Sequence, residues 1–193
     1  MTVQREIIVK QIVNLNTQSK DGQIELFGLL LNRLPVAFWN TVSERLLKAV
    51  PADKREEVKA ALIDCAVENG YHTGHGILSS PAFKALVGPM VTEGPKDLLR
   101  GLFAIFSAAG WAKSGIVQIK EAEKMVIRAV DYFEADGAPG EKRAFMIIGA
   151  CAAFFDLVYG PPFPDGLGAF QCEQVAGIEC GDPFGQFVVT KKE

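Results

Sequence analysis

The stretch GIECGDPFGQFVV at residues 177–189 predicts how the last part of this chain folds. Asp182 and Pro183 favour a tight turn, because Asp accepts hydrogen bonds from nearby backbone amides and Pro fixes φ. The residues after the turn alternate between the two faces of a strand, with Phe184, Gln186 and Val188 on one face and Phe187 and Val189 on the other. The segment therefore predicts a hairpin that closes the domain, and a hairpin that closes over a ligand or metal site is the sharper alternative.

Upstream of this hairpin, the spacing of apolar residues changes several times along the chain. It predicts strands within residues 22–35, helices at 35–49, 51–78, 83–91 and 95–110, a hairpin at 116–133, a helix at 141–159, and two strands at 169–179 and 184–190. Strands that pair locally, with helices gathered between them, predict an α+β fold in which an antiparallel sheet built from hairpins packs against a helical layer. Residues 1–21 are expected to form a leader of undefined shape, and residues 22–193 the domain.

The bulk composition excludes several classes of protein. The 193 residues carry a net charge of −3 with no cluster of Lys and Arg, so we expect no nucleic-acid partner. The N-terminal residues are charged too early for a signal peptide. The longest apolar run, at 144–160, contains Asp156 and is shorter than the roughly 20 residues that span a bilayer, so we expect no membrane span. Four cysteines without a secretory signal indicate reduced thiols in a cytoplasmic protein.

Cys172 and Cys180 are the first candidate for a metal site. On one continuous strand they would lie about 26 Å apart, and on a helix about 12 Å apart. Zinc needs each sulfur about 2.3 Å away, so the pair can share a metal only if the chain folds back between them. Gly177 and Gly181 would permit that fold. We expect buried or turn-exposed thiols and no metal, with the folded-back hairpin as the alternative.

His72 and His75 are the only histidines, and their spacing places both rings on one face of a helix. Gly70, Gly74 and Gly76 surround them, which indicates that a neighbouring element approaches this helix closely. Packing with two satisfied imidazoles is the favoured interpretation. Contact with a ligand is the alternative.

Large aromatic side chains are frequent in the central half of the chain, next to a patch of small residues at 149–153. Large groups opposite small ones either interlock as a core or leave an apolar chamber. Ala150 is expected to border such a chamber.

Three motifs, in this order, resemble the 4-vinyl reductase domain family over residues 22–190: ENGYHTGHG at 68–76, AAGWAKSGIVQI at 108–119, and GDPFGQFVV at 181–189. The fold of that family is similar to that of vesicle-tethering subunits of the transport-particle type. The resemblance implies a domain that binds a small aromatic molecule, and it favours the chamber over a filled core.

The resemblance also implies a zinc ion held by one Glu and three Cys near the closing hairpin. This chain departs from that pattern. Gln174 stands at the position of the usual Glu, and Gly177 and Gly185 stand at positions of two Cys. We therefore expect no metal and no cofactor.

Together these observations predict a cytoplasmic domain that binds a small hydrophobic or aromatic molecule in an internal pocket, for sensing, delivery, or as an accessory to a biosynthetic or degradative pathway. The expected ligand contacts are His72, His75, Phe103, Phe106, Trp111, Phe145, Cys151, Phe154, Phe155 and Tyr159. A homodimer is expected, because a monomer would leave the N-terminal strands and the apolar segment at 82–91 uncovered. Two alternatives stay open: a hydrolase or reductase-associated enzyme that pairs Cys172 or Cys180 with a histidine, and a structural assembly subunit.

Overall fold

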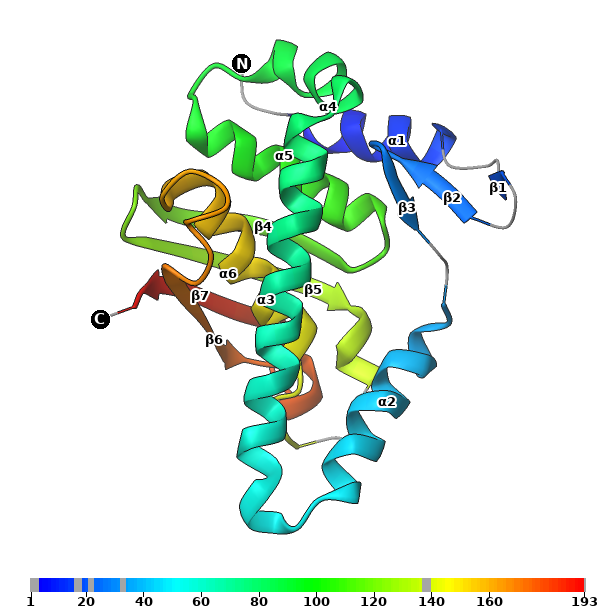
Figure 1. The fold of residues 1–193 in the computed structure, drawn as a ribbon, viewed down its shortest axis with the longest axis vertical. Helices are drawn as coiled ribbons and strands as arrows, with labels where there is room; N and C mark the ends of the chain where they lie inside the picture. The colour runs from blue at the N-terminus through cyan, green and yellow to red at the C-terminus, as the bar shows by residue number, and fades with distance from the viewer. Residues whose placement is uncertain (1–3, 16–18, 21–22, 32–33, 137–139, 193) are drawn as a thin grey trace.

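The structure is a computed structural model that describes residues 4–15, 19–20, 23–31, 34–136 and 140–192 (Figure 1). In chain order, with η for a 3-10 helix, the elements are α1 (Arg5–Leu15), β1 (Ser19–Lys20), β2 (Gln23–Leu26), β3 (Leu29–Leu31), α2 (Val36–Ala49), η1 (Ala52–Lys54), α3 (Arg55–Ser79), α4 (Pro81–Leu86), η2 (Gly88–Met90), α5 (Pro95–Ala108), β4 (Ala112–Lys120), β5 (Lys124–Tyr132), η3 (Phe133–Asp136), α6 (Phe145–Tyr159), β6 (Phe170–Ala176), η4 (Ile178–Cys180) and β7 (Gly185–Lys191).

The main sheet is antiparallel, with strand order β4-β5-β7-β6. The last strand, β7, lies between β5 and β6: Phe187 pairs with Ile127 on one side, and Val189 pairs with Cys172 on the other. Phe187 and Val189 are fully buried, as expected from their place on one face of the strand. The predicted α+β class, with a hairpin-built sheet against a helical layer, is confirmed.

The turn before β7 forms as its sequence predicts. Asp182 accepts a 2.8 Å hydrogen bond from the backbone N–H of Gly177, so the side chain caps the turn as an Asp in a turn commonly does. Gly181 has a φ of 91°, a left-handed conformation that favours glycine. The chain does turn back between β6 and β7, and residues 178–180 form η4 at the bend.

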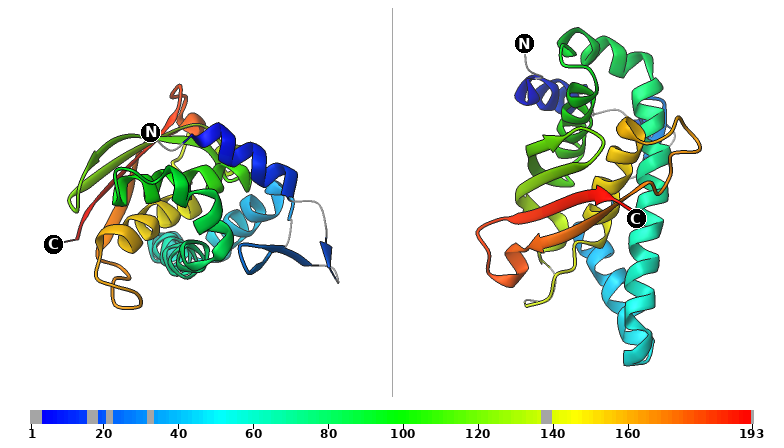
Figure 2. Two further views of the ribbon diagram at one scale, coloured as in Figure 1. Left: turned by 90° about the horizontal axis from the view of Figure 1, so that it is seen from above. Right: turned by 90° about the vertical axis from the view of Figure 1, so that its left-hand side faces the viewer.

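The helices form two layers on one face of the main sheet. α5 and α6 contact the strands, and α3 lies on the outer side of α6 (Figure 2). α3 and α6 approach closely because small residues line their contact: a Cβ on Gly149 would lie 2.5 Å from the Ala66 Cβ and 2.7 Å from the Ile63 carbonyl oxygen. On α3, Gly70 faces Ala153 in the same way, which confirms that the glycines around the histidines mark a close approach.

Two local predictions about the helices were wrong. The helix expected from residue 141 begins at Phe145, because the backbone amides before and within its first turn donate to side chains from other segments. The helical spacing of Leu62, Cys65 and Ala66 predicts that all three face inward on α3. Leu62 and Ala66 are buried, but Cys65 is exposed.

The N-terminal residues contribute to the core. Ile8 and Ile12 of α1 are fully buried, and α1 packs against α5. β1, β2 and β3 form a separate small antiparallel sheet beside α1 (Figure 1). The boundary between a leader at 1–21 and a domain at 22–193 stays a prediction. None of the helices that the structure describes is long and apolar enough to cross a membrane.

Candidate functional site

Four of the expected ligand contacts meet in one group, which we call the aromatic cluster: Phe103 and Phe106 of α5, Trp111 at the start of β4, and Phe154 of α6. The Phe154 ring centroid lies 5.5 Å from that of Phe103 and 5.7 Å from that of Phe106, in edge-to-face geometry. The Trp111 ring lies 5.2 Å from the Phe106 ring, tilted by 37°. The three phenylalanines are nearly fully buried and Trp111 is partly exposed, so the cluster runs from the interior to the surface.

A second group lies farther along α6. Phe155 contacts Tyr159 and Phe170, with ring centroids 4.9 and 4.6 Å away. The Tyr159 hydroxyl is buried and has no hydrogen-bond partner among the described residues, and the same holds for the Ser114 hydroxyl on β4. Burial raises the pKa of Tyr159, so the phenol stays protonated and able to donate. Buried hydroxyls without partners are uncommon and are candidates for contact with a bound polar group.

Cys151 and Cys172 face each other where α6 meets β6. Burial, with a smaller contribution from a hydrogen bond to Cys151, raises the pKa of the Cys172 thiol well above its usual range. A thiol with a raised pKa is a poor nucleophile, because the thiolate is the reactive form. Cys180 is exposed on η4. No hydrogen bond among the described residues joins either cysteine to a histidine, so the described geometry does not assemble the cysteine-histidine pair of the enzyme alternative.

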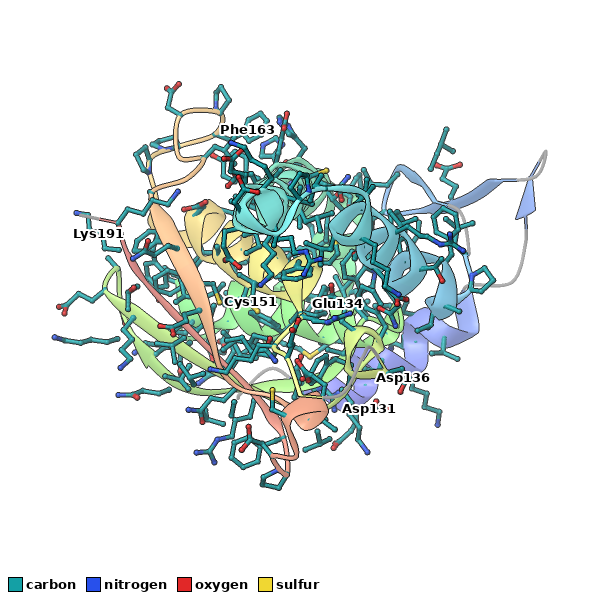
Figure 3. The ribbon with its side chains drawn as sticks, turned by 90° about the horizontal axis from the view of Figure 1, so that it is seen from below. Asp131, Glu134, Asp136, Cys151, Phe163 and Lys191 are labelled. Carbon is teal, nitrogen blue, oxygen red and sulfur yellow. The ribbon has the colours of Figure 1, made fainter. Side chains whose placement is uncertain are left out.

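The two histidines lie on the outer side of α3, away from the aromatic cluster. The His75 ring stacks on Phe163 at 3.8 Å, and Tyr71 stacks on Phe163 at 5.3 Å. His72 meets the same ring edge-on. The Tyr71 hydroxyl also accepts a hydrogen bond from the backbone of Gly166 at 3.2 Å. Figure 3 shows Phe163 beside α3 on the side away from the sheet, whereas Cys151 lies between α6 and the sheet. The histidines therefore hold the loop at 160–169 against α3.

Phe145 belongs to neither group. It packs with Leu47 of α2 and Leu62 of α3 in a small cluster of its own. The sequence placed it with the other aromatic residues because residue type carries no information about which helix faces which.

The closing hairpin holds a buried polar network that sequence analysis missed. Glu179 of η4 accepts hydrogen bonds from the Tyr132 hydroxyl, from the Gln174 Nε2 atom at 2.7 Å, and from the Arg143 backbone N–H at 3.2 Å. The Tyr132 oxygen in turn accepts bonds from Gln174 and from the Ile178 backbone, each at 3.2 Å. Burial first, and the bond to Glu179 second, raise the pKa of Tyr132.

This network fills the position where the family resemblance implies zinc ligands. A Cβ on Gly185 would lie 2.5 Å from the Tyr132 ring, and a Cβ on Gly177 would lie 2.7 Å from the Gln174 Nε2 atom. No side chain larger than hydrogen fits at either position as the residues stand. Among the described residues, no group of three or more His, Cys, Asp or Glu side chains gathers in a way that could hold a metal ion.

A second buried carboxylate, Glu134 of η3, caps the first turn of α6. Its two oxygens accept the backbone N–H groups of Met146 and Ile147 at 3.0 and 2.9 Å. Burial raises the pKa of Glu134 to about 8, although these two bonds oppose the shift. The sequence offered no signal for this role, because Glu134 follows a strand and precedes a turn, far from the usual capping position.

Two pockets lie on the surface, away from the aromatic cluster. One, of about 570 Å³, is lined by Val36, Ala37, Asn40, Thr41, Glu44, Asp136 and Arg143. The other, of about 610 Å³ and more open, is lined by Glu25, Phe27, Gly28, Gly76, Ser79, Ser80, Pro81 and Ala82. The sequence predicted neither, because each is formed by segments far apart in the chain.

No family model matches this chain, and no curated protein matches it. Several solved structures are similar to it, and they include two proteins of low sequence identity. One is the phenol-responsive sensory domain of the transcription activator PoxR, with phenol: 13% identity, a TM-score of 0.72, and coverage of 99% of this chain and 92% of that one. The other is a trafficking protein particle complex subunit 3 from Naegleria fowleri covalently bound to palmitic acid: 12% identity, a TM-score of 0.56, and coverage of 82% and 95%. At these identities the likeness establishes the fold alone, and this chain has the fold that a phenol-responsive sensory domain and a vesicle-trafficking subunit share.

Proposed function

We propose that this protein binds a small aromatic molecule within the aromatic cluster, between α5, α6 and the start of β4. The observation that carries the proposal is the edge-to-face contact among the rings of Phe103, Phe106 and Phe154, with the Trp111 ring tilted against that of Phe106. The ring of an aromatic ligand can make the same kind of contact with these side chains as they make with one another. Binding is favoured by roughly 25 cal/mol for each Å² of apolar surface removed from water. The shared fold with a phenol-responsive sensory domain supports a ligand of this class.

Buried hydroxyls would set the orientation of the ligand. The hydroxyls of Tyr159 and Ser114, both buried and without a described partner, are the proposed contacts for a ligand hydroxyl. Phe155 and Cys151, which contact β6, are proposed as further ligand contacts on α6. For His72 and His75 we propose an indirect role, in holding the loop at 160–169. Phe145 packs elsewhere, so the proposal leaves it out.

The two tryptophans allow a direct test. In a Trp39→Phe background, Trp111 is the only tryptophan, and its fluorescence reports on the cluster. Titration with phenol is expected to give a saturable change in Trp111 fluorescence, together with a saturable heat in calorimetry. Phe106→Leu, which keeps an apolar side chain but removes the ring, should abolish both signals, whereas Phe38→Leu on the exposed surface should leave them unchanged. A parent protein that gives neither signal would refute the proposal.

The exposed surface of α2 is suited to contact with a second copy of the chain. Phe38, Trp39 and Leu46 of this helix expose 46, 39 and 45% of their surface. Exposed apolar surface of this kind marks contact sites between proteins. We propose a cytoplasmic homodimer joined through α2. The apolar segment at 82–91, the expected interface, contributes less than expected, because Phe83 and Val87 face α5 and are buried.

A further inference from the structure

The rings of the aromatic cluster already contact one another, which limits how a ligand can enter. Phe154 lies edge-to-face against Phe103 and Phe106, and all three rings are nearly fully buried. Side chains packed at the density of a protein interior admit a further ring only if one of them moves. Trp111 is partly exposed, so it is the ring of the cluster that can move outward without entering the packed interior.

Phe133, the first residue of η3, contacts Trp111 through both its ring and its backbone. The two ring centroids lie 5.4 Å apart in edge-to-face geometry. The backbone N–H of Phe133 donates a 3.1 Å hydrogen bond to the Trp111 carbonyl oxygen. Phe133 is itself only partly buried, at the margin of the main core. A displacement of the Trp111 ring therefore acts directly on Phe133.

The carbonyl oxygen of Phe133 holds α2. It accepts a 3.0 Å hydrogen bond from the Nδ2 atom of Asn40, and α2 lies beside η3, the segment that follows β5 (Figure 1). Of the 14 residues of α2, all of which the structure describes, only Leu47 is buried. A helix with so little buried apolar surface is weakly attached. The Asn40 bond therefore counts for more than it would on a buried helix.

We propose that a ligand in the aromatic cluster loosens α2, a coupling that rests on the binding of an aromatic molecule proposed above. Entry of the ligand displaces the Trp111 ring, the Trp111 ring displaces Phe133, and the hydrogen bond from Asn40 to the Phe133 carbonyl breaks. α2 also carries the exposed rings of Phe38 and Trp39. Its release therefore alters the surface proposed for contact with a second copy of the chain.

Coupling of this kind is reciprocal, so a change at α2 must also change the affinity of the cluster for its ligand. In the parent protein, binding loses the contribution of the Asn40 hydrogen bond. Asn40→Ala has no such bond to lose. It is expected to bind phenol about two- to tenfold more tightly than the parent, the factor that corresponds to one hydrogen bond. A merely structural role for Asn40 would not raise the affinity.

Hydrogen exchange of the full chain, with and without phenol, tests the same coupling from the side of α2. Phenol at saturation is expected to make the amides of α2 exchange faster, although a bound ligand ordinarily stabilises the folded state. In Asn40→Ala, these amides should already exchange faster without phenol. Phenol should then produce no further increase, because the bond that it breaks is absent.

Two further variants serve as controls. Asn69→Ala makes the same substitution on the exposed surface of α3 and should leave phenol affinity and α2 exchange as they are in the parent. Phe133→Leu removes the ring that contacts Trp111 and keeps the carbonyl that holds Asn40. It should still bind phenol, but its α2 amides should no longer respond. Asn40→Ala changes a partly exposed side chain, so it keeps the test decisive if Phe133→Leu fails to fold.

The possible results separate this coupling from the binding on which it rests. If the parent binds phenol but exchange in α2 does not become faster, or if Asn40→Ala binds phenol no more tightly than the parent, the coupling is overturned and the binding proposal stands. If the parent gives no phenol signal, both are refuted.

Discussion

The Nε2 atom of Gln174 lies 2.7 Å from the Oε1 atom of Glu179, and the Tyr132 hydroxyl donates to the other oxygen of the same carboxylate. The three side chains come from β5, β6 and η4, and all are buried. A buried carboxylate persists when several donors share its charge, as they do here. The network therefore joins the closing hairpin to the middle of the sheet.

Removing one hydroxyl from this network should lower stability. Tyr132→Phe loses the bond to Glu179 and the two bonds that the Tyr132 oxygen accepts. We expect the free energy of unfolding to fall by about 1–3 kcal/mol, the usual cost of leaving a buried polar group unsatisfied. Denaturant unfolding measures it, with the exposed Asp131→Asn as the control. A midpoint equal to that of the parent would show that the network contributes nothing to stability.

We expect no zinc bound by Cys172 and Cys180. The Cys172 thiol faces Cys151, Cys180 is exposed on η4, and the space beside Gly177 and Gly185 is filled by the Tyr132 network. Elemental analysis of protein purified without a chelator measures the metal content. One zinc per chain, lost on Cys180→Ser, would contradict this expectation.

Glu134 should make stability depend on pH. Its pKa is raised from 4.5 to about 8 in the folded protein, so the native state binds a proton that the unfolded state has released. The stabilisation linked to this proton is complete below pH 4.5 and is lost as the pH rises to about 8, by at most about 1.4 kcal/mol per pH unit. Parallel unfolding curves for the parent and Glu134→Gln measure the difference. If the free energies of unfolding of the parent and of Glu134→Gln change in the same way between about pH 5 and pH 9, the carboxyl group of Glu134 does not cause the pH dependence.

Ala150→Phe should destabilise the protein. The sequence predicted that Ala150 borders a chamber that a larger ring would fill, and this prediction was wrong. Ala150 and Ala153 both face Gly70 of α3: a Cβ on Gly70 would lie 3.3 Å from the Ala150 Cα and 3.0 Å from the Ala153 Cβ. A phenyl ring there separates two closely packed helices, at a cost of at least about 1–3 kcal/mol. Thermal unfolding checks it, with the exposed Ala60→Phe on α3 as the matched control. An unchanged unfolding temperature would show that α3 and α6 can move apart at little cost in free energy.

The proposed dimer should depend on the apolar surface of α2. Phe38→Glu places a charge among Trp39 and Leu46, and a charge desolvated in an interface is unfavourable. Sedimentation of the parent at micromolar concentration is expected to show a dimer and that of Phe38→Glu a monomer. Phe163→Ala, which removes a partly exposed ring from the loop at 160–169 and leaves α2 unchanged, is the control. A monomeric parent would rule out the dimer.

The sequence predicted a helix or strand well where the pattern of apolar residues within that segment alone shows which side chains are buried. Phe187 and Val189 alternate with half-exposed residues, so the period of β7 was visible without knowing its neighbours. The start of α6 was placed wrongly because its amides are held by Glu134 and by Gln174, which lie outside the helix in the sequence. A cap supplied by a distant segment leaves no local pattern to detect.

The candidate site was likewise predicted only in part from the sequence. Residue type identified the rings of the aromatic cluster, but it grouped His72 and His75 with them, although both histidines contact Phe163 on the other side of α3. The partner of each ring is set by tertiary packing. Spacing along one helix carries no information about it.

The central position of β7 also has a consequence for biosynthesis. The N-terminal part of a chain leaves the ribosome first. β4 and β5 can therefore form their hairpin while residues 185–191 are still inside the ribosome. During that interval β5 has an open hydrogen-bonding edge, β6 has no neighbour in the sheet, and the apolar side of α6 has only part of its cover. Unpaired strand edges and uncovered apolar faces are what makes partly folded chains aggregate. The nascent chain therefore depends on β7 to pair the open edge of β5 and to bring β6 into the sheet.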